Sequence, residues 1–297
     1  MPDDRGETQS TRPAAIASPA ELAALVDGSA VSVVERDVVT VDGPDSATYL
    51  QGQLSQDVVA LPVGADALTF LLEPQGRLVA VARVHRASDD RFVLDVEPGI
   101  GAAVVTRLNR FKLRTKASIS LESGVVHLAY RGPEGSVPQE ARRVVLPGLS
   151  GWDLPGNPDP PAGSALVGTD PLEALRVAAG IPAACDLDDR TVPAETGLVE
   201  AAASFTKGCY TGQELVARMD SRAALPPRRI RRISGAGGPP AVGSSVETPD
   251  GRAAGRLSTV VGTGAEWTAL ALVPRAVEGG PVSVDDGELR VAATVEA

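Results

Sequence analysis

One segment of the chain places a cysteine between two glycines, immediately before a predicted helix. It reads Lys207-Gly208-Cys209-Tyr210-Thr211-Gly212-Gln213-Glu214. Thr211 and Glu214 have the spacing of a capping box, in which each side chain binds a backbone N–H of the first helical turn. Leu215 and Met219 then lie four residues apart, as one buried stripe of a helix requires. Glycine tolerates positive φ and lets other groups approach the backbone, so we expect Cys209 on an open loop at the start of a helix.

The surroundings of Cys209 favour a thiolate. The positive end of a helix and a neighbouring ammonium both lower the pKa of a thiol, and Lys207 supplies the ammonium. The chain contains only three lysines, Lys112, Lys116 and Lys207, among 28 basic residues, so a lysine at this position indicates that a compact point charge is needed. We expect a reactive or metal-contacting cysteine. The alternative is a small cysteine packed beneath the helix.

The same segment resembles the signature K-G-C-Y-x-G-Q-E of the YgfZ family. These are folate-binding proteins implicated in iron–sulfur cluster assembly or repair, and they are relatives of the glycine cleavage T-protein. A second stretch, residues 43–57, is similar to the opening of the same family, with Tyr49 where phenylalanine is usual. The resemblance extends from about residue 22 to the C-terminus and is weaker outside the motif.

The resemblance implies a cytoplasmic, tetrahydrofolate-binding accessory protein that serves iron–sulfur proteins or their assembly machinery. In that role Cys209 contacts iron transiently, because one thiolate cannot supply the four ligands of a cluster, and we expect no permanently bound metal. Cys209 and Lys207 are thus the expected catalytic residues, with Lys207 holding the thiol ionised. One alternative is a folate-dependent one-carbon transferase, aminomethyltransferase-like or RNA-modifying, with Cys209 as nucleophile or redox centre. Another is a folate-storing module whose cysteine is only structural. We favour the accessory role over an enzyme, and nothing in the sequence specifically supports a tRNA contact.

Folate recognition is expected at Glu195. Its surroundings, Pro193-Ala194-Glu195-Thr196-Gly197-Leu198, are similar to the T-protein stretch whose glutamate holds folate. A carboxylate can accept the two parallel N–H bonds that a pterin ring offers; the alternative is a solvated loop carboxylate. Further folate contacts are expected from the motif and from an arginine-rich stretch behind it, at Gly208, Tyr210, Gly212, Gln213, Glu214, Arg222 and Arg229. That stretch could instead bind RNA phosphates or form an edge strand with exposed arginines.

A departure from the T-protein pattern argues against glycine cleavage. T-proteins carry an aspartate pair after a glycine turn, and one of these residues serves aminomethyl transfer. Ala80 and Val81 occupy the matching positions here. Without an acid at this site, the proton transfers of that reaction lose a participant. His85, at the end of the same predicted strand, is more often a structural residue in such a place.

Composition excludes several classes of protein. The net charge of −10 argues against a nucleic-acid-binding surface over the whole protein. Two cysteines, Cys185 and Cys209, and two histidines, His85 and His127, provide neither a disulfide framework nor a closed zinc site. Residues 1–17 are polar and resemble neither a signal peptide nor an anchor, and no apolar run is long enough to cross a bilayer.

The order of the predicted elements favours an α+β fold. We expect strands at 67–72, 77–85 and 91–96, a helix at 102–111, and a hairpin-like pair of strands at 117–121 and 125–130. After residue 228, short strands alternate with Gly, Pro and Asp turns, a pattern typical of a small all-β barrel.

The resemblance adds a T-protein-like body of three parts. We therefore divide the chain into a disordered tail (1–17), a folate-binding body of two interleaved α+β subdomains (18–227) and a C-terminal β-barrel (228–297). The resemblance places folate in a central channel, with Cys209 facing that channel or its rim.

Overall fold

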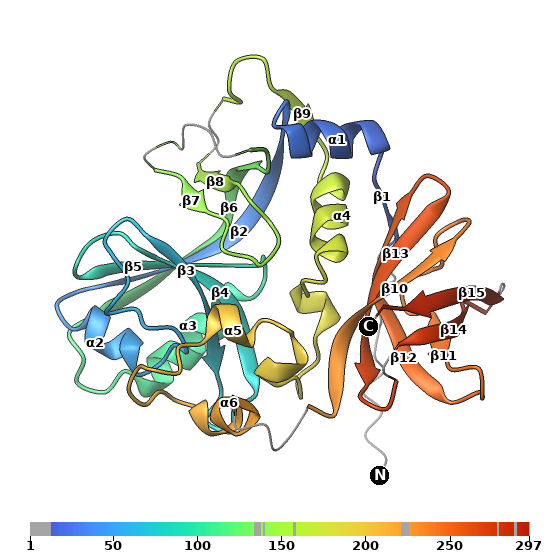
Figure 1. Cartoon of the computed structure of the whole chain (residues 1–297). Helices are drawn as coiled ribbons and strands as arrows, with labels where there is room; N and C mark the ends of the chain where they lie inside the picture. Colours follow the sequence, from blue (N-terminus) through green and yellow to red (C-terminus); the bar gives the residue numbers. More distant parts are fainter. Residues whose placement is uncertain are drawn as a thin grey trace, which may run out of the picture.

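The computed structural model describes residues 13–133, 138, 140–156, 159–220, 226–277, 279–287 and 290–296, without the side chains of 217–220. These residues form two sheets that lie side by side, with helix α4 between them and α1 above it (Figure 1). The predicted α+β class and the C-terminal barrel are both confirmed. In the described residues, no helix is long and apolar enough to cross a membrane.

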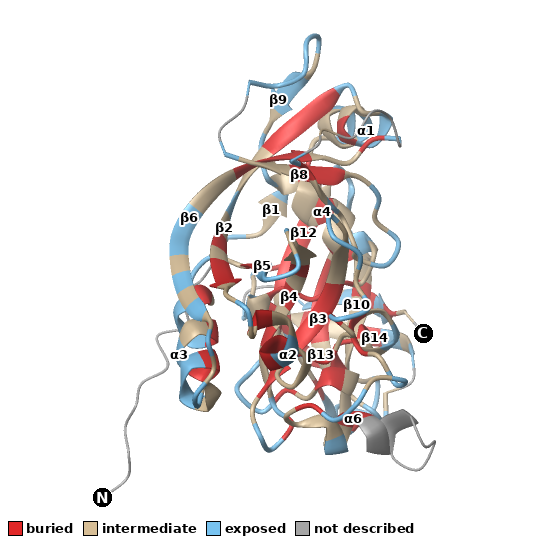
Figure 2. Cartoon of the chain, turned by 90° about the vertical axis from the view of Figure 1, so that its left-hand side faces the viewer, coloured by how far each residue is buried: buried red, intermediate tan, exposed pale blue. Residues whose placement is uncertain are grey.

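The larger sheet has the strand order β3-β4-β5-β2-β6-β8-β7, and β9 pairs with β2 in parallel. Its strands are β2 (Ala30–Asp42), β3 (Asp66–Leu72), β4 (Leu78–Arg86), β5 (Arg91–Val96), β6 (Ser118–Tyr130), β7 (Arg142–Arg143), β8 (Trp152–Pro155) and β9 (Ala165–Val167). Helices α2 (Ser46–Gln51) and α3 (Gly101–Phe111) cover one face and turn their buried residues toward it (Figure 2). Because successive side chains of a strand point to opposite faces, Ala82 and Leu94 join this apolar layer while Arg83 and Asp95 face the other way.

The predicted hairpin between 117 and 130 is wrong, because β6 is one continuous strand. Its register against β2 shifts between Arg36 and Val38, where two residues of β6 lie opposite Asp37. The buried carboxylate of Asp37 accepts the N–H of Gly124 at this bulge and the N–H groups of Gly99 and Gly101 at the start of α3. One aspartate therefore both fixes the bulge and caps a helix.

The N-terminal segment joins the two sheets. Residues 1–12 of the predicted disordered tail lie outside the described residues. The remainder is ordered: β1 (Ala15–Ile16) pairs in parallel with the barrel strand β12, and Ala17 is buried. Helices α1 (Pro19–Asp27) and α4 (Asp170–Ala178) then pack against each other, and α4 also packs on β12 and β13. The expected tail was wrong at residues 15–17 because strand pairing and burial hold them in place.

The segment after α4 returns across the larger sheet and carries the cysteine motif. Its elements are the short helices η1 (Ala184–Asp186), η2 (Pro193–Glu195), α5 (Val199–Ala202) and α6 (Gln213–Asp220). Leu198, Tyr210 and Val216 pack on the side chains of Leu68, Phe70 and Leu72 from β3. This apolar layer lies on the face of β3 toward the motif, so β3 positions the loop that contains Cys209.

The C-terminal strands close into a six-strand barrel, since β12 and β13 pair directly with each other. The strands are β10 (Arg228–Ala236), β11 (Ser245–Glu247), β12 (Ala253–Thr263), β13 (Glu266–Pro274), β14 (Gly280–Asp285) and β15 (Arg290–Val295). Apart from Trp267, valine, alanine, leucine and isoleucine fill its interior. We keep residue 228 as the proposed start of the barrel domain, because β10 begins there.

Trp267 anchors the barrel core. Its side chain is fully buried, and its ring fills the space beside Gly235, where a Cβ would lie 2.4 Å from the ring. We expect Trp267→Ala to lower the free energy of unfolding by about 3–5 kcal/mol, because it leaves a large cavity. Urea unfolding measures this loss. The control, Trp267→Phe, keeps most of the volume and should cost clearly less; equal losses would mean that volume is not what the site requires.

Candidate functional site

The ammonium of Lys207 binds three backbone carbonyls at the end of α2 and in the turn after it. Nζ donates to the oxygens of Gln51, Leu54 and Gln56 at 2.7, 2.7 and 2.9 Å. An ammonium has three donors, so these contacts use all of them. The expectation that Lys207 holds Cys209 as a thiolate is not supported by these contacts. Lys207 instead ties the motif loop to a helix C-terminus, where unpaired carbonyls favour a cation.

Other motif residues also serve to seat the loop. The N–H and the hydroxyl of Thr211 donate to the carbonyl of Gly52 at 3.0 and 3.3 Å. Gly212 has φ +83°, and a Cβ there would lie 2.7 Å from the carbonyl oxygen of Glu73. Glycine is thus required at 212, and the group that approaches it is this chain's own backbone.

The predicted capping box is wrong, because α6 begins at Gln213 and the hydroxyl of Thr211 binds Gly52. Gln213 provides the local contact in its place: its Oε1 accepts the N–H of Tyr210 at 3.1 Å. Tyr210 itself is only 9% exposed and packs in the apolar layer on β3. Burial raises the pKa of its hydroxyl to about 12.

Cys209 is exposed on this tightly held loop. Gly208 is exposed beside it and has no heavy atom within 4 Å of where its Cβ would be. Phe205, four residues earlier, is 46% exposed. The alternative of a cysteine packed beneath the helix is therefore wrong. Within the described ranges, no cluster of His, Cys, Asp and Glu side chains could hold a metal ion, so any iron contact at Cys209 needs ligands from elsewhere.

Glu195, the residue expected to bind the pterin ring, forms an ion pair with Arg228. Its carboxylate is 1% exposed and accepts from Nε and Nη2 of Arg228 at 2.9 and 3.2 Å and from the N–H of Val192 at 3.1 Å. Arg228 also binds Asp188. A planar guanidinium therefore occupies the two parallel acceptors that we expected a pterin to use. The alternative of a solvated carboxylate is wrong, because the side chain is buried.

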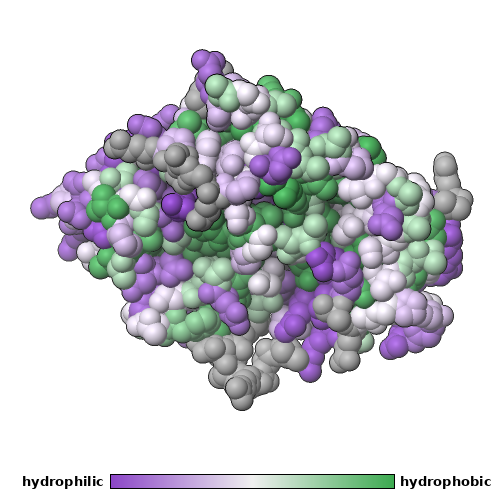
Figure 3. All heavy atoms as spheres, turned by 45° about the horizontal axis from the view of Figure 1, so that its top comes forward, coloured by the Kyte–Doolittle hydropathy of each residue, from purple (hydrophilic) through white to green (hydrophobic). Residues whose placement is uncertain are grey.

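A cavity of about 770 Å³ lies between the larger sheet, α4 and the loop 144–149. Its apolar wall includes Leu68, Val81, Leu149, Leu172 and Ile181. Figure 3 shows apolar residues gathered around a hollow near the centre of the face that it presents. Pockets of 300–1,000 Å³ are typical of sites for small molecules and cofactors.

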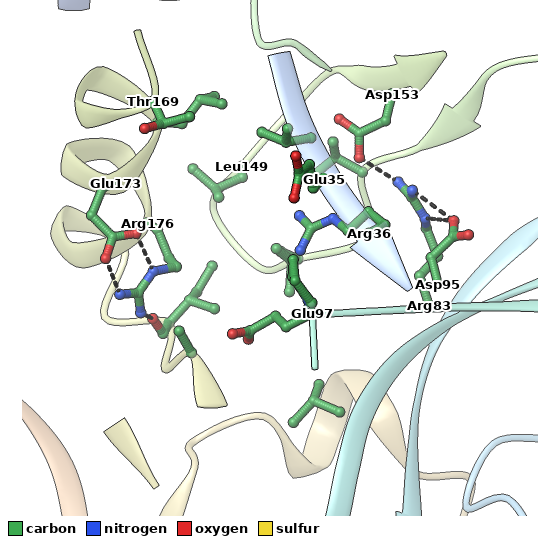
Figure 4. A pocket seen from close by; sticks show the side chains of 18 of the residues that line it. Glu35, Arg36, Arg83, Asp95, Glu97, Leu149, Asp153, Thr169, Glu173 and Arg176 are labelled. Carbon is green, nitrogen blue, oxygen red and sulfur yellow. Dashed lines mark hydrogen bonds and ion pairs between the residues drawn. The ribbon is translucent and has the colours of Figure 1, made fainter. Parts of the chain in front are cut away.

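The sheet side of this cavity carries an ion-pair network centred on Arg83. Its guanidinium donates to Asp95 at 2.8 and 3.0 Å and to Asp153 at 2.8 Å (Figure 4). Burial alone would raise the pKa of Asp153, but Arg131 and Arg83 hold it well below its ordinary value. Asp153 is therefore ionised, and arginines hold both carboxylates.

Arg36 and Glu97 lie between this network and α4. In Figure 4 the guanidinium of Arg36 points into the open space of the cavity, and on α4 Glu173 and Arg176 form their own ion pair. Glu97 accepts the N–H of Ala184 with both oxygens, at 2.9 and 3.0 Å, and burial raises its pKa.

The residues expected to contact folate do not line this cavity. Seven of them are absent from its lining: Glu195, Gly208, Tyr210, Gly212, Gln213, Glu214 and Arg229. The eighth, Arg222, lies outside the described residues. Cys209 does not line it either, so the expected placement of the thiol on the channel is not observed. The thiol and the cavity are two separate features of the molecule.

The charged residues of the cavity were missed in the sequence, although a signal was present. Arg36, Arg83 and Asp95 each interrupt an apolar strand. A charge inside a buried strand is rare unless it is paired, and the period of two places such residues on one face. Val81 lines the cavity and Ala80 lies in the core, so the missing T-protein carboxylates leave an apolar wall.

Comparison with known proteins identifies the family. No family model matches the chain. It is 32% identical over 207 residues to an uncharacterized protein of Haemophilus influenzae, covering 65% of this chain and 69% of that protein. It is 29% identical over 219 residues to the tRNA-modifying protein YgfZ of Edwardsiella ictaluri, covering 63% and 65% of the two chains. The chain belongs to the YgfZ family.

This YgfZ-family chain also matches a mitochondrial relative and an enzyme fold. It is 29% identical over 297 residues to the iron-sulfur cluster assembly factor IBA57 of Mus musculus. This match covers 87% of this chain and 81% of the mouse protein. The crystal structure of the glycine cleavage system aminomethyltransferase T from Bartonella henselae superposes with a TM-score of 0.78 at 18% identity, over 94% and 88% of the chains. The predicted T-protein-like fold is confirmed.

The carbonyl cluster around Lys207 makes a clear prediction for stability. Lys207→Met would leave three carbonyls without their donor, so we expect a loss of about 1–3 kcal/mol in the free energy of unfolding. Lys112→Met is the matched control, because among the described residues its Nζ donates to a single carbonyl, that of Ala117. Urea unfolding of both variants checks the difference; a smaller loss for Lys207→Met than for Lys112→Met would contradict the role of Lys207.

The same lysine predicts a pH dependence. Burial lowers the pKa of Lys207 to about 8, against 10.5 for the unfolded chain. Between these two values the unfolded chain binds more protons, so through this group the free energy of unfolding rises with pH. The difference in unfolding free energy between wild type and Lys207→Met should therefore grow from pH 8 to pH 10.5. Parallel pH profiles of the two proteins would contradict the burial of this charge.

Proposed function

We propose that this protein is a tetrahydrofolate-binding accessory factor that supports the assembly or repair of iron–sulfur clusters. The observation that carries the proposal is the exposure of Cys209 on a loop whose other residues bind the rest of the protein and so fix the position of the loop. Four neighbouring residues hydrogen-bond to or pack against the rest of the protein: Lys207, Tyr210, Thr211 and Gly212. Cys209 is exposed. The name of one relative, the iron-sulfur cluster assembly factor IBA57 of Mus musculus, supports the iron–sulfur part of this role, whereas the YgfZ relative is named as a tRNA-modifying protein.

The chemistry proposed for Cys209 is a transient contact with iron. A thiolate is a soft ligand suited to iron–sulfur chemistry, and Cys209 would lose its proton on binding. A cluster takes four ligands, and no other described side chain forms a metal-binding group. The remaining ligands would come from a partner protein, which an exposed thiol can reach.

The second half of the proposal is folate in the cavity, and the residues present fit such a ligand. The volume of about 770 Å³ suits a cofactor, and the apolar walls suit flat rings. Arg36 offers a cation for a carboxylate, and Glu97 offers carboxylate oxygens for N–H donors. When bound, tetrahydrofolate would supply a carrier for one-carbon units. The chain's own residues would bind and orient it and exclude water.

We propose binding without turnover. The cavity presents Val81 where the T-protein resemblance places a carboxylate, and Arg83 binds both Asp95 and Asp153. No carboxylate of this network is therefore left to move a proton during aminomethyl transfer. Consumption of a methylene- or methyl-folate in the presence of a candidate acceptor would instead favour the transferase alternative.

Replacing the thiol tests the proposed function. In a strain without its own homologue, we expect Cys209→Ser to leave iron–sulfur enzyme activities at the level of the deletion, whereas Cys185→Ser restores them. Both thiols are exposed, but Sγ of Cys185 contacts the hydroxyl of Thr259 at 3.6 Å, so Cys209 should also alkylate faster than Cys185 near neutral pH. Because Cys209 does not line the cavity, Cys209→Ser should bind tetrahydrofolate as tightly as wild type. Full rescue by Cys209→Ser would overturn the role of the thiol and favour the folate-storing alternative.

A further inference from the structure

Arg36 differs from the other arginines that line the cavity. Arg83, Arg131 and Arg176 each form ion pairs with acidic side chains at 2.7–2.8 Å. Arg36 forms none within the described part of the chain, and its guanidinium makes no hydrogen bond to a described atom. Asp153 and Glu97 act on it only from a longer range.

This unpaired charge has an energetic cost. A guanidinium that is partly removed from water without a partner loses hydration that no described group replaces. Burial accordingly lowers the pKa of Arg36, although an arginine stays charged. Its nitrogens are not among the sealed polar atoms that lack a partner, so a ligand in the cavity can reach them.

The backbone holds Arg36 in this position. It is the last residue of β2 before the register against β6 shifts, and the bulge there is fixed by the contacts of Asp37 with Gly99, Gly101 and Gly124. Bulges beside functional sites commonly re-aim a side chain. Three backbone contacts thus hold the neighbouring residue, while the side chain of Arg36 points into the cavity.

We propose that Arg36 is the anion-binding residue of the cavity and takes a carboxylate of the ligand's tail. The fork of a guanidinium matches a carboxylate with two parallel hydrogen bonds. This inference rests on the proposed function, in which the ligand is a folate, and it assigns the glutamate tail to Arg36. The protein then distinguishes folates from pterins that lack the tail.

Glu97 and Glu173 restrict where a negatively charged group of the ligand can bind in the cavity. Both carboxylates line the cavity, Glu97 on the side of Arg36 and Glu173 across the cavity on α4 (Figure 4), and both would repel an anion. Glu173 is held by Arg176, whereas Glu97 contacts a backbone N–H. Of the two carboxylates of a glutamate tail, we therefore expect one to bind at Arg36.

The test compares three ligands on four proteins by calorimetry. The ligands are 5-formyltetrahydrofolate, the tail-free 6-methyltetrahydropterin, and p-aminobenzoylglutamate, which has the tail without the pterin. The proteins are wild type, Arg36→Gln, Arg36→Lys and the control Arg77→Gln, which removes an exposed arginine outside the cavity. Urea unfolding establishes that each variant is folded.

We expect Arg36→Gln to weaken both glutamate-bearing ligands by about 10- to 100-fold, as the loss of hydrogen bonds to a charged group implies. The tail-free pterin should bind all four proteins equally. Arg36→Lys should be intermediate because it keeps the charge without the fork, and Arg77→Gln should match wild type. Raised salt should weaken folate binding to wild type more than to Arg36→Gln.

Each other outcome has a defined meaning. Unchanged folate affinity in folded Arg36→Gln overturns the inference and leaves the proposed function standing. An equal loss for the folate and the tail-free pterin also overturns it, because Arg36 would then act on the ring or on the cavity as a whole. If p-aminobenzoylglutamate binds in an Arg36-dependent way and the folate does not bind, the carboxylate site is supported and folate is ruled out as the ligand. No binding of any ligand to wild type overturns both.

Discussion

A single ammonium group fixes the part of the molecule on which the proposed chemistry depends. Lys207 binds the carbonyls of Gln51, Leu54 and Gln56, and these lie more than 150 residues away in the chain. The contact joins the end of α2 to the loop before α6. A guanidinium would not fit three converging carbonyls in the same way, because its donors lie in one plane. The exposed thiol of Cys209 therefore has a defined position without itself taking part in the packing.

The two faces of the larger sheet have different tasks. Toward α2 and α3 the strands present alanine, valine, leucine and phenylalanine, which form the main apolar core. Toward the cavity they present Arg83 and Asp95, joined by Asp153 from β8. Strand β3 connects the two functional regions, since Leu68 lines the cavity and Leu72 packs against Gly212 of the motif.

Local spacing in the sequence was enough for most of the elements and for the family. The strand at 91–96 agrees with the predicted bounds, and the helix at 102–111 differs by one residue. Prediction failed where a distant contact replaced a local one. Residues 118–130 form one strand, because β2 pairs along its whole length and Asp37 binds Gly124, so the expected turn has no role. Likewise, Thr211 binds Gly52 and not the first turn of its own helix.

The sequence by itself determined the α+β order, the C-terminal barrel and the cysteine loop, because each follows from the period of apolar residues or from the spacing within a short motif. Only the tertiary structure decided which charges meet. It paired Glu195 with Arg228, gave Lys207 three carbonyls, and left Arg36 facing a cavity without a partner among the residues that the structure describes. The physical reason is that a charge is compensated by whatever group the fold brings within a few ångströms of it, and those groups come from strands and loops far away in the chain.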